Sequence, residues 1–180
     1  MALIVHKYGG TSMGSIERIQ QVAKRVAKWA RAGHQMVIVP SAMSGETNRL
    51  LALAEEVAPA SSTPSSLREM DMIASTGEQA SVALLALALQ AEGVPAVSFT
   101  GWQVPIRTDN SYTKARIEGI DDKRVRTELN AGKVVVITGF QGVDENGNIT
   151  TLGRGGSDTS AVAVAAALKA TECLIFTDVD

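Results

Sequence analysis

A lysine followed by two glycines and two hydroxyl residues stands near the start of the chain, in the segment 7–12 (KYGGTS). Glycines let backbone N–H groups approach a ligand closely, and a helix that begins here would add N–H groups without partners of their own. Such a segment can cradle a phosphate group, although its residue order differs from that of a Walker A loop. A tight strand-to-helix turn that happens to contain a lysine is the alternative that the spacing leaves open.

A second glycine-rich segment covers residues 150–158 (TTLGRGGSD). Arg154 lies among its three glycines, and a guanidinium can donate paired hydrogen bonds to a carboxylate or a phosphate. Asp158 could hold a cationic amine, but an acidic residue in the first turn of a helix is also favourable with the helix dipole alone. The segment as a whole favours a loop that binds an anion.

Other polar residues carry weaker signals. Glu78 stands near the start of a predicted helix, where dipole stabilisation is a sufficient explanation. Asp178 and Asp180 could bind magnesium or a ribose, or could simply end a strand in water. Cys173 lies in an apolar strand and is expected to be a small core residue. The two histidines stand near no nucleophile signature and are expected to be structural or exposed.

The elements that would position these residues alternate along the chain. Apolar strands are predicted at residues 3–8, 36–39, 96–100, 134–138 and 173–177, with a hairpin over 140–151 that turns at 145–147. Helices are predicted from Ser15 to Gly33, over about 47–57, from a capping box at Thr76 and Gln79 to Gly93, over 123–131 and over 157–168. The segments 58–66 and 109–120 are expected to be a surface connection and a polar excursion.

Strands this apolar cannot face water on one side, so the pattern predicts a mainly parallel sheet with helices on both faces. The expected fold is a three-layer α/β/α sandwich. Ligands of such sheets bind beyond the carboxyl ends of the strands. Both glycine-rich segments, the segment 41–48 and the last residues of the chain are predicted to meet at that edge.

Composition narrows the function further. The 180 residues carry a formal net charge of -2 and only 4% aromatic residues, which argues against a partner that is nucleic acid. The longest apolar run, 82–89, is too short to cross a membrane, and no secretory leader is evident. A single cysteine excludes an internal disulfide. We therefore expect a cytoplasmic protein without a membrane partner, which could form a homo-oligomer.

Six motifs follow one another through the chain: 7–12 (KYGGTS), 41–48 (SAMSGETN), 75–79 (STGEQ), 98–101 (SFTG), 139–142 (GFQG) and 151–158 (TLGRGGSD). Together they resemble the motifs of the aspartate kinases, which have the amino-acid kinase fold. The last motif, taken with the first, is highly specific. Carbamate, glutamate and nucleotide-monophosphate kinases share the fold but not this set.

The resemblance implies ATP-dependent phosphorylation of the L-aspartate side chain to 4-phospho-L-aspartate, the first step of lysine, threonine and methionine biosynthesis, with Mg²⁺ accompanying ATP. It implies Lys7 and Asp158 as the catalytic residues. The expected ATP-binding residues are Lys7, Tyr8, Gly9, Gly10, Ser157, Thr177 and Asp178. The expected aspartate-binding residues are Ser41, Thr47, Glu78, Arg154, Gly155, Gly156 and Ser157.

By the same resemblance, residues 1–180 would form the N-terminal portion of the catalytic domain. Aspartate kinases continue with a segment that supplies much of the adenine pocket, and usually with two regulatory ACT modules. Both are expected to be absent here, so the predicted fold is C-terminally incomplete. Two other functions stay open: a non-catalytic module that binds aspartate or a similar small anion, and a kinase like glutamate 5-kinase that forms another acyl phosphate.

Overall fold

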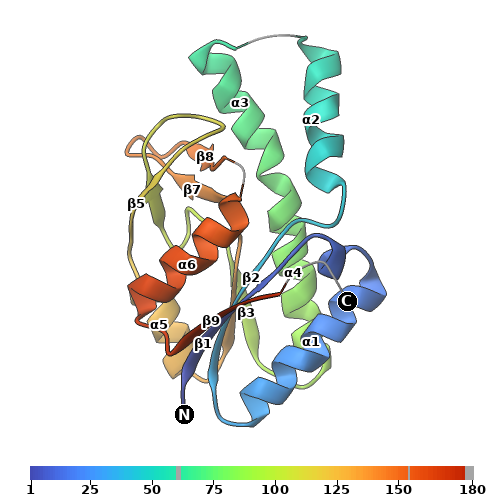
Figure 1. The fold of residues 1–180 in the computed structure, drawn as a ribbon, viewed down its shortest axis with the longest axis vertical. Coiled ribbons are helices and arrows are strands. Elements are labelled where there is room, and N and C mark those ends of the chain that lie inside the picture. The colour runs from blue at the N-terminus through green and yellow to red at the C-terminus, as the bar shows by residue number, and fades with distance from the viewer. Residues whose placement is uncertain (60–61, 154, 177–180) are drawn as a thin grey trace.

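The computed structural model describes residues 1–59, 62–153 and 155–176 (Figure 1). Its main sheet has the strand order β3-β6-β2-β1-β9, and all neighbouring strands in it run parallel. The strands are β1 (Leu3–Tyr8), β2 (Gln35–Pro40), β3 (Ala96–Phe99), β6 (Val134–Ile137) and β9 (Glu172–Phe176). Each lies within a residue or two of its predicted range, so the parallel sheet is confirmed.

Helices cover both faces of this sheet, as the apolar strands predicted (Figure 1). One core cluster joins the sheet to α1 (Ile16–Arg31) and α4 (Thr76–Ala91), and the other joins it to α5 (Lys123–Asn130) and α6 (Gly156–Leu168). Successive strand residues enter opposite clusters, because side chains of a strand alternate between the two faces. The three-layer α/β/α arrangement is confirmed.

A smaller sheet with the order β5-β4-β7-β8 lies beside the main one. It contains β4 (Ile106–Thr108), β5 (Ile117–Ile120), β7 (Gln141–Val143) and β8 (Ile149–Thr151). The β7–β8 hairpin was predicted. The β4–β5 pair was not, because strands of three or four residues that include arginine, glutamate and glycine are too short to show a hydrophobic alternation.

The helices α2 (Glu46–Val57) and α3 (Pro64–Ala74) form a hairpin that projects from the body of the molecule (Figure 1). Helix α3 was not predicted from the sequence, and its first turn was assigned to a surface connection. Its start is nevertheless regular: Pro64 is in the first turn, and the Thr63 hydroxyl accepts a hydrogen bond from the Ser66 N–H. Serine and proline mark a helix start here, where they were interpreted as a loop.

The capping box predicted at Thr76 is wrong. Ser75 has helical backbone angles (φ -66°, ψ -20°) and its N–H donates to the Asp71 carbonyl, so α3 continues directly into α4. The Thr76 hydroxyl donates backward to the Ile73 carbonyl, whereas a cap would accept a bond from the following turn. Residues 64–91 thus form one long helical rod.

This rod is long and apolar enough to cross a membrane by length and composition alone, a test that core helices of soluble proteins also pass. Half of its most apolar window is buried within the molecule. Its second part, α4, packs on α1 and on three strands of the main sheet. In this fold the second part of the rod, α4, therefore acts as a core helix.

Candidate functional site

A cavity of about 650 Å³ opens beyond the carboxyl ends of β1 and β2. Its walls are the turn after β1, the segment after β2 with the first turn of α2, and the loop that leads into α6. It also receives Glu78 from α4, Thr113 and Phe140. The predicted meeting of the two glycine-rich segments and the segment 41–48 at this edge of the sheet is confirmed.

Lys7 extends from β1 into this cavity. Its Nζ lies 3.0 Å from Oδ1 of Asp158, in the first turn of α6, and its side chain is only 13% exposed. Lys7 shares the face of β1 with Val5, which packs in the α6-side core, so strand alternation directs the lysine toward the start of α6. The ion pair holds an ammonium group where both glycine-rich segments meet.

The two helices that start at the cavity begin in the same unusual way. The residue before α2 is Gly45 (φ +79°) and the residue before α6 is Gly155 (φ +73°), and no side chain caps either helix. Glycine adopts this left-handed conformation without strain. The very first N–H of each helix donates to a carbonyl in the preceding turn. The next N–H groups of each first turn have no acceptor within the helix, and an anion in the cavity would satisfy them.

A further glycine allows α6 to begin this close to the cavity wall. A Cβ on Gly156 would lie 2.8 Å from Cδ1 of Phe140 and 2.9 Å from Cβ of Leu152. No side chain fits there without displacing the wall. The glycines of the second motif thus have distinct geometric roles, in the turn (Gly155) and in close packing (Gly156).

Glu78 is almost completely buried, with 3% of its surface exposed. Burial raises the pKa of its carboxyl group to about 7, against the opposing effect of its own backbone N–H and that of Ala42. Its Oε1 has no hydrogen-bond partner among the residues that the structure describes. Because α3 continues into α4, Glu78 does not lie at a free helix start, and the dipole explanation given from the sequence does not account for it.

Two serines meet at the centre of the cavity wall. The Ser41 hydroxyl donates to Oγ of Ser157 over 3.3 Å, and the Ser81 hydroxyl donates to the Ser41 carbonyl over 2.7 Å. Thr47, in the first turn of α2, lines the same cavity. These contacts join the segment after β2 to the start of α6 and to α4.

Some of the predicted site residues lie elsewhere. The Tyr8 side chain is buried on the α1 side of the sheet, stacked on Phe176 with its hydroxyl 3.0 Å from Nδ1 of His6. Gly9 is buried and does not line the cavity, whereas Gly10 does. Arg154 and residues 177–180, which include Thr177, Asp178 and Asp180, lie outside the described residues.

The remaining weak candidates are structural in this fold. His6 is fully buried among aromatic rings, and burial lowers the pKa of its imidazole to about 4. Cys173 is partly buried against the α6-side core, and burial raises the pKa of its thiol. Both agree with the expectation of packing roles.

The structure adds two residues that sequence reasoning did not place in the site, Thr113 and Phe140. Both line the cavity, and both have positive φ angles (72° and 71°) that side chains larger than glycine rarely adopt. Strain of this kind gathers at functional sites. Phe140 lies within the motif 139–142, which was a usable signal. Nothing in the sequence marks Thr113.

A model of the amino acid kinase family matches residues 2–180, essentially the whole length. The chain belongs to this family. It is 65% identical over 181 aligned positions to the aspartate kinase of Pseudomonas fluorescens and 62% identical to the aspartokinase of Pseudomonas aeruginosa. Both matches cover 100% of this chain and 43% of the relative, so the chain spans less than half the length of these relatives.

Solved structures of the family agree with the fold. The aspartate kinase of Synechocystis superposes with a TM-score of 0.83 at 50% identity, over 98% of this chain and 28% of that one. The complex of E. coli aspartokinase III with aspartate and ADP superposes with a TM-score of 0.86 at 27% identity, over 97% of this chain and 49% of that one. An isopentenyl phosphate kinase, at 20% identity and a TM-score of 0.73, shares the fold alone.

Proposed function

We propose that this chain is the N-terminal portion of an aspartate kinase catalytic domain. In that function the γ-phosphoryl group of ATP passes to the side-chain carboxylate of L-aspartate. Two findings support this proposal: the identity to aspartate kinases over the whole chain, and a cavity with the chemistry that such a reaction needs. Of the two, the cavity is the support that comes from the residues of this chain.

The decisive observation is that Lys7 and the uncapped starts of α2 and α6 share one cavity. The reaction must bring an anionic carboxylate against an anionic triphosphate. One favourable charge pair at ~4 Å is worth roughly 4 kcal/mol at an effective dielectric constant of 20. A lysine and two helix starts together can offset the repulsion between two such anions.

The reaction needs no strong base, because a carboxyl group with a pKa of ~4 is already ionised at neutral pH. A carboxylate oxygen of aspartate forms the new bond to the γ-phosphorus, and the bond between that phosphorus and the bridging oxygen of ATP breaks. ADP leaves with the electron pair, and no proton is transferred at this step. Catalysis is then positioning and charge neutralisation, as in other phosphoryl transfers.

Within this proposal, Lys7 contacts the transferring phosphoryl group and Asp158 orients the ammonium group of Lys7. Glu78 binds the amino group of aspartate, because an ammonium group would pair with its free Oε1 and keep the carboxyl group ionised. Arg154 binds a substrate carboxylate. The N–H groups of the turn at Gly155 and of the following residues complete the anion site.

The proposal also assigns roles to residues of the cavity wall and to residues at the edge of the nucleotide site. Ser41 and Thr47 line the region between aspartate and phosphate, and Gly10 contributes a backbone N–H to the phosphate. Thr177 and Asp178 are proposed to lie at the edge of the nucleotide site. The rest of that site and any regulatory modules belong to segments that follow in longer relatives.

Magnesium fits as part of the nucleotide substrate. No group of three or more histidine, cysteine, aspartate or glutamate side chains that could hold a metal ion occurs in the described part of the chain. Mg²⁺ needs few protein ligands when phosphate oxygens supply the others. We therefore propose that ATP binds as its Mg²⁺ complex. We also propose that the protein is cytoplasmic.

Trapping the acyl phosphate with hydroxylamine tests the proposal. The chain is incubated with ATP, Mg²⁺ and either L-aspartate or L-glutamate, with a full-length aspartate kinase as positive control, and aspartate binding is measured by calorimetry in parallel. Hydroxamate from aspartate alone supports the proposal, and hydroxamate from glutamate alone contradicts it. Aspartate binding without product, both in this chain and in a longer chain that includes the segments following in the relatives, would indicate a binding module.

A further inference from the structure

The helical rod formed by α3 and α4 carries a stripe of polar side chains through apolar surroundings. Its members recur at three- or four-residue spacing and therefore share one face of the rod. We call them the rod stripe: Arg68, Asp71, Ser75, Glu78 and Ser81. Asp71, Ser75, Glu78 and Ser81 are buried, which is unusual for residues of these types.

Every member of the rod stripe has a polar partner outside the rod, and for Glu78 this is the Ala42 N–H, which leaves Oε1 without a partner among the described residues. Arg68 donates to Oδ1 of Asn148, and Ser81 donates to the Ser41 carbonyl. The Ser75 carbonyl accepts from Nε2 of Gln141 over 2.9 Å. The stripe therefore joins the rod to the small sheet at one end and to the cavity at the other.

Asp71 makes the largest set of these contacts. Its Oδ2 accepts from the Thr151 N–H over 2.8 Å, and its Oδ1 accepts from the Thr151 hydroxyl over 2.7 Å. The Thr113 N–H lies 3.1 Å from each oxygen. The side chain is 1% exposed. Removing a buried carboxylate that accepts from three donors is costly, because each donor would stay buried without an acceptor.

One partner of Asp71 lines the cavity, and the other directly precedes residues that do. Thr113 lines the cavity itself and holds a positive φ angle that favours glycine. Thr151 lies at the start of the second glycine-rich segment, whose next members, Leu152 and Gly153, line the cavity. One carboxylate thus joins two segments of the cavity region that are distant in the sequence.

We propose that Asp71 is a positioning residue, which holds Thr113 and the start of the glycine-rich loop in the arrangement that binds the amino-acid substrate. Its carboxylate does not line the cavity, so it acts through these two segments. The identity of the ligand rests on the proposed function, whereas the geometric role does not.

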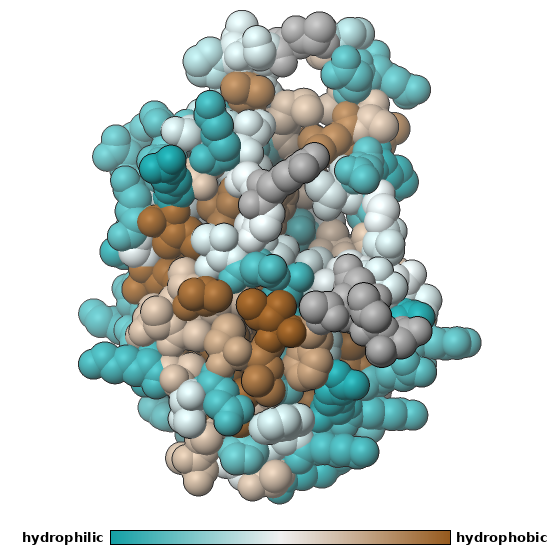
Figure 2. Space-filling model, in the orientation of Figure 1, coloured by the Kyte–Doolittle hydropathy of each residue, from teal (hydrophilic) through white to brown (hydrophobic). Residues whose placement is uncertain are grey.

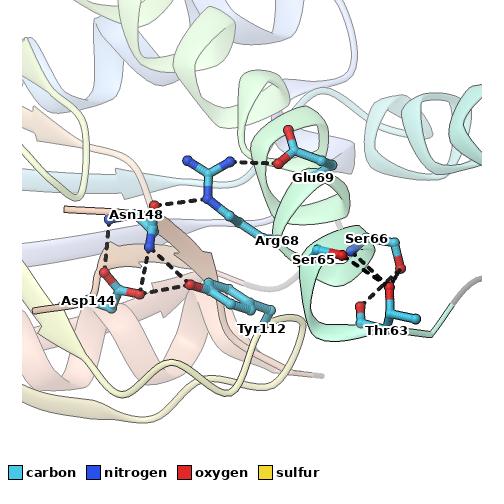
Figure 3. Close-up of polar contacts among 8 residues, drawn as sticks. All are labelled: Thr63, Ser65, Ser66, Arg68, Glu69, Tyr112, Asp144 and Asn148. Carbon is cyan, nitrogen blue, oxygen red and sulfur yellow. Dashed lines mark hydrogen bonds and ion pairs between the residues drawn. The ribbon is translucent and has the colours of Figure 1, made fainter. Parts of the chain in front are cut away.

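Asp144 provides a matched comparison, because it is a second buried carboxylate in the same region (Figure 3). It is 6% exposed and accepts from the Tyr112 hydroxyl over 2.9 Å and from the backbone of Asn146 and Asn148. Tyr112 precedes Thr113, and Asn148 also receives Arg68 of the rod stripe. None of the partners of Asp144 lines the cavity.

The test compares Asp71→Asn with Asp144→Asn, two identical exchanges at similar burial. Urea unfolding measures stability, calorimetry measures the Kd for L-aspartate, and hydrogen exchange by NMR follows individual backbone amides. We expect both variants to lose stability. Asp71→Asn alone should raise the Kd by about tenfold, the scale of one lost charge-assisted hydrogen bond. The amides of residues 113 and 151–153 should exchange faster in Asp71→Asn than its global stability explains.

Equal Kd values in the two variants, or unchanged exchange at residues 113 and 151, would overturn the proposal. If Asp71→Asn does not fold, the isosteric Thr151→Val removes one donor only and should raise the Kd by about threefold. A wild-type chain that binds no aspartate contradicts the proposed function instead. In that case, hydrogen exchange alone decides the positioning role of Asp71.

Discussion

Asp71 and Glu78 lie on one face of the same helical rod, about two turns apart, and both are carboxylates withdrawn from water. They differ in their partners. Asp71 accepts three donors from the protein, whereas Oε1 of Glu78 has none among the described residues. A satisfied buried carboxylate is part of the scaffold, and an unsatisfied one beside a cavity is available to a ligand. This difference in hydrogen bonding distinguishes groups that hold the site together from groups that would bind a ligand.

The largest expected effect on activity is that of Lys7, which belongs to the groups that would bind a ligand. We expect Lys7→Ala to retain aspartate binding and to lower kcat roughly a thousandfold, since ~4 kcal/mol of charge stabilisation is removed. Steady-state kinetics in the hydroxamate assay measures the loss. The unfolding midpoint should move little, because Asp158 is half exposed and becomes solvated. Turnover like that of the wild type would refute the role of Lys7.

Among the groups that hold the site together, Asp71 should show the largest loss of stability when it is replaced, in Asp71→Ala. Three buried donors would lose their acceptor at once, which costs about 3–5 kcal/mol of the free energy of unfolding. Urea denaturation followed by circular dichroism measures this loss. Asp144→Ala is the control for removal of a buried carboxylate beside the same loop. A change below about 1 kcal/mol would show that the donors find water instead.

Glu78 differs from Asp71, because two backbone N–H groups offset the burial of its carboxyl group only in part. Its pKa in the folded chain is about 7, above the ordinary 4.5, so the folded state binds the proton more tightly than the unfolded state. This contribution to stability is complete below about pH 4.5 and is lost as the pH rises through 7. Between pH 5 and pH 8 the loss should be about 2–3 kcal/mol.

Glu78→Gln should abolish this pH dependence and weaken aspartate binding. Urea midpoints at several pH values measure the first effect, and calorimetry measures the second. If an ammonium group pairs with Glu78, aspartate binding should also strengthen as the pH rises through 7, with release of a proton. A Gln variant that keeps the full pH dependence of stability would assign the effect to another group.

The smallest expected effect concerns the helix start at Gly155. Gly155→Ala would place a side chain at φ +73°, at a cost of about 1 kcal/mol of stability, and should also weaken the binding of an anion at α6. Gly147→Ala, at φ +82° in the β7–β8 turn, carries the same strain away from the cavity. Unfolding and binding measurements on the pair should show equal losses of stability but unequal losses of affinity.

Most of the main fold was predictable from the sequence. Buried parallel strands are visible in the sequence as short apolar runs, and all five strands of the main sheet were located in this way. The small sheet and α3 were not, because strands of three or four residues carry too little pattern, and the start of α3 has turn-like residues. Six of the predicted site residues line one cavity, while their roles stay predictions: Lys7, Ser41, Thr47, Glu78, Ser157 and Asp158.

The layered fold, the resemblance to the family, and the edge of the sheet where glycine-rich segments gather were all predictable from the sequence. These depend on local pattern and short motifs. Three features were visible only once the chain was folded. Tyr8 faces away from the cavity, Thr113 lines it, and Asp71 has donors for both carboxylate oxygens while Oε1 of Glu78 has none among the described residues. The reason is physical: the direction of a side chain and the supply of hydrogen-bond donors around a buried carboxylate depend on segments distant in sequence, which packing alone brings together.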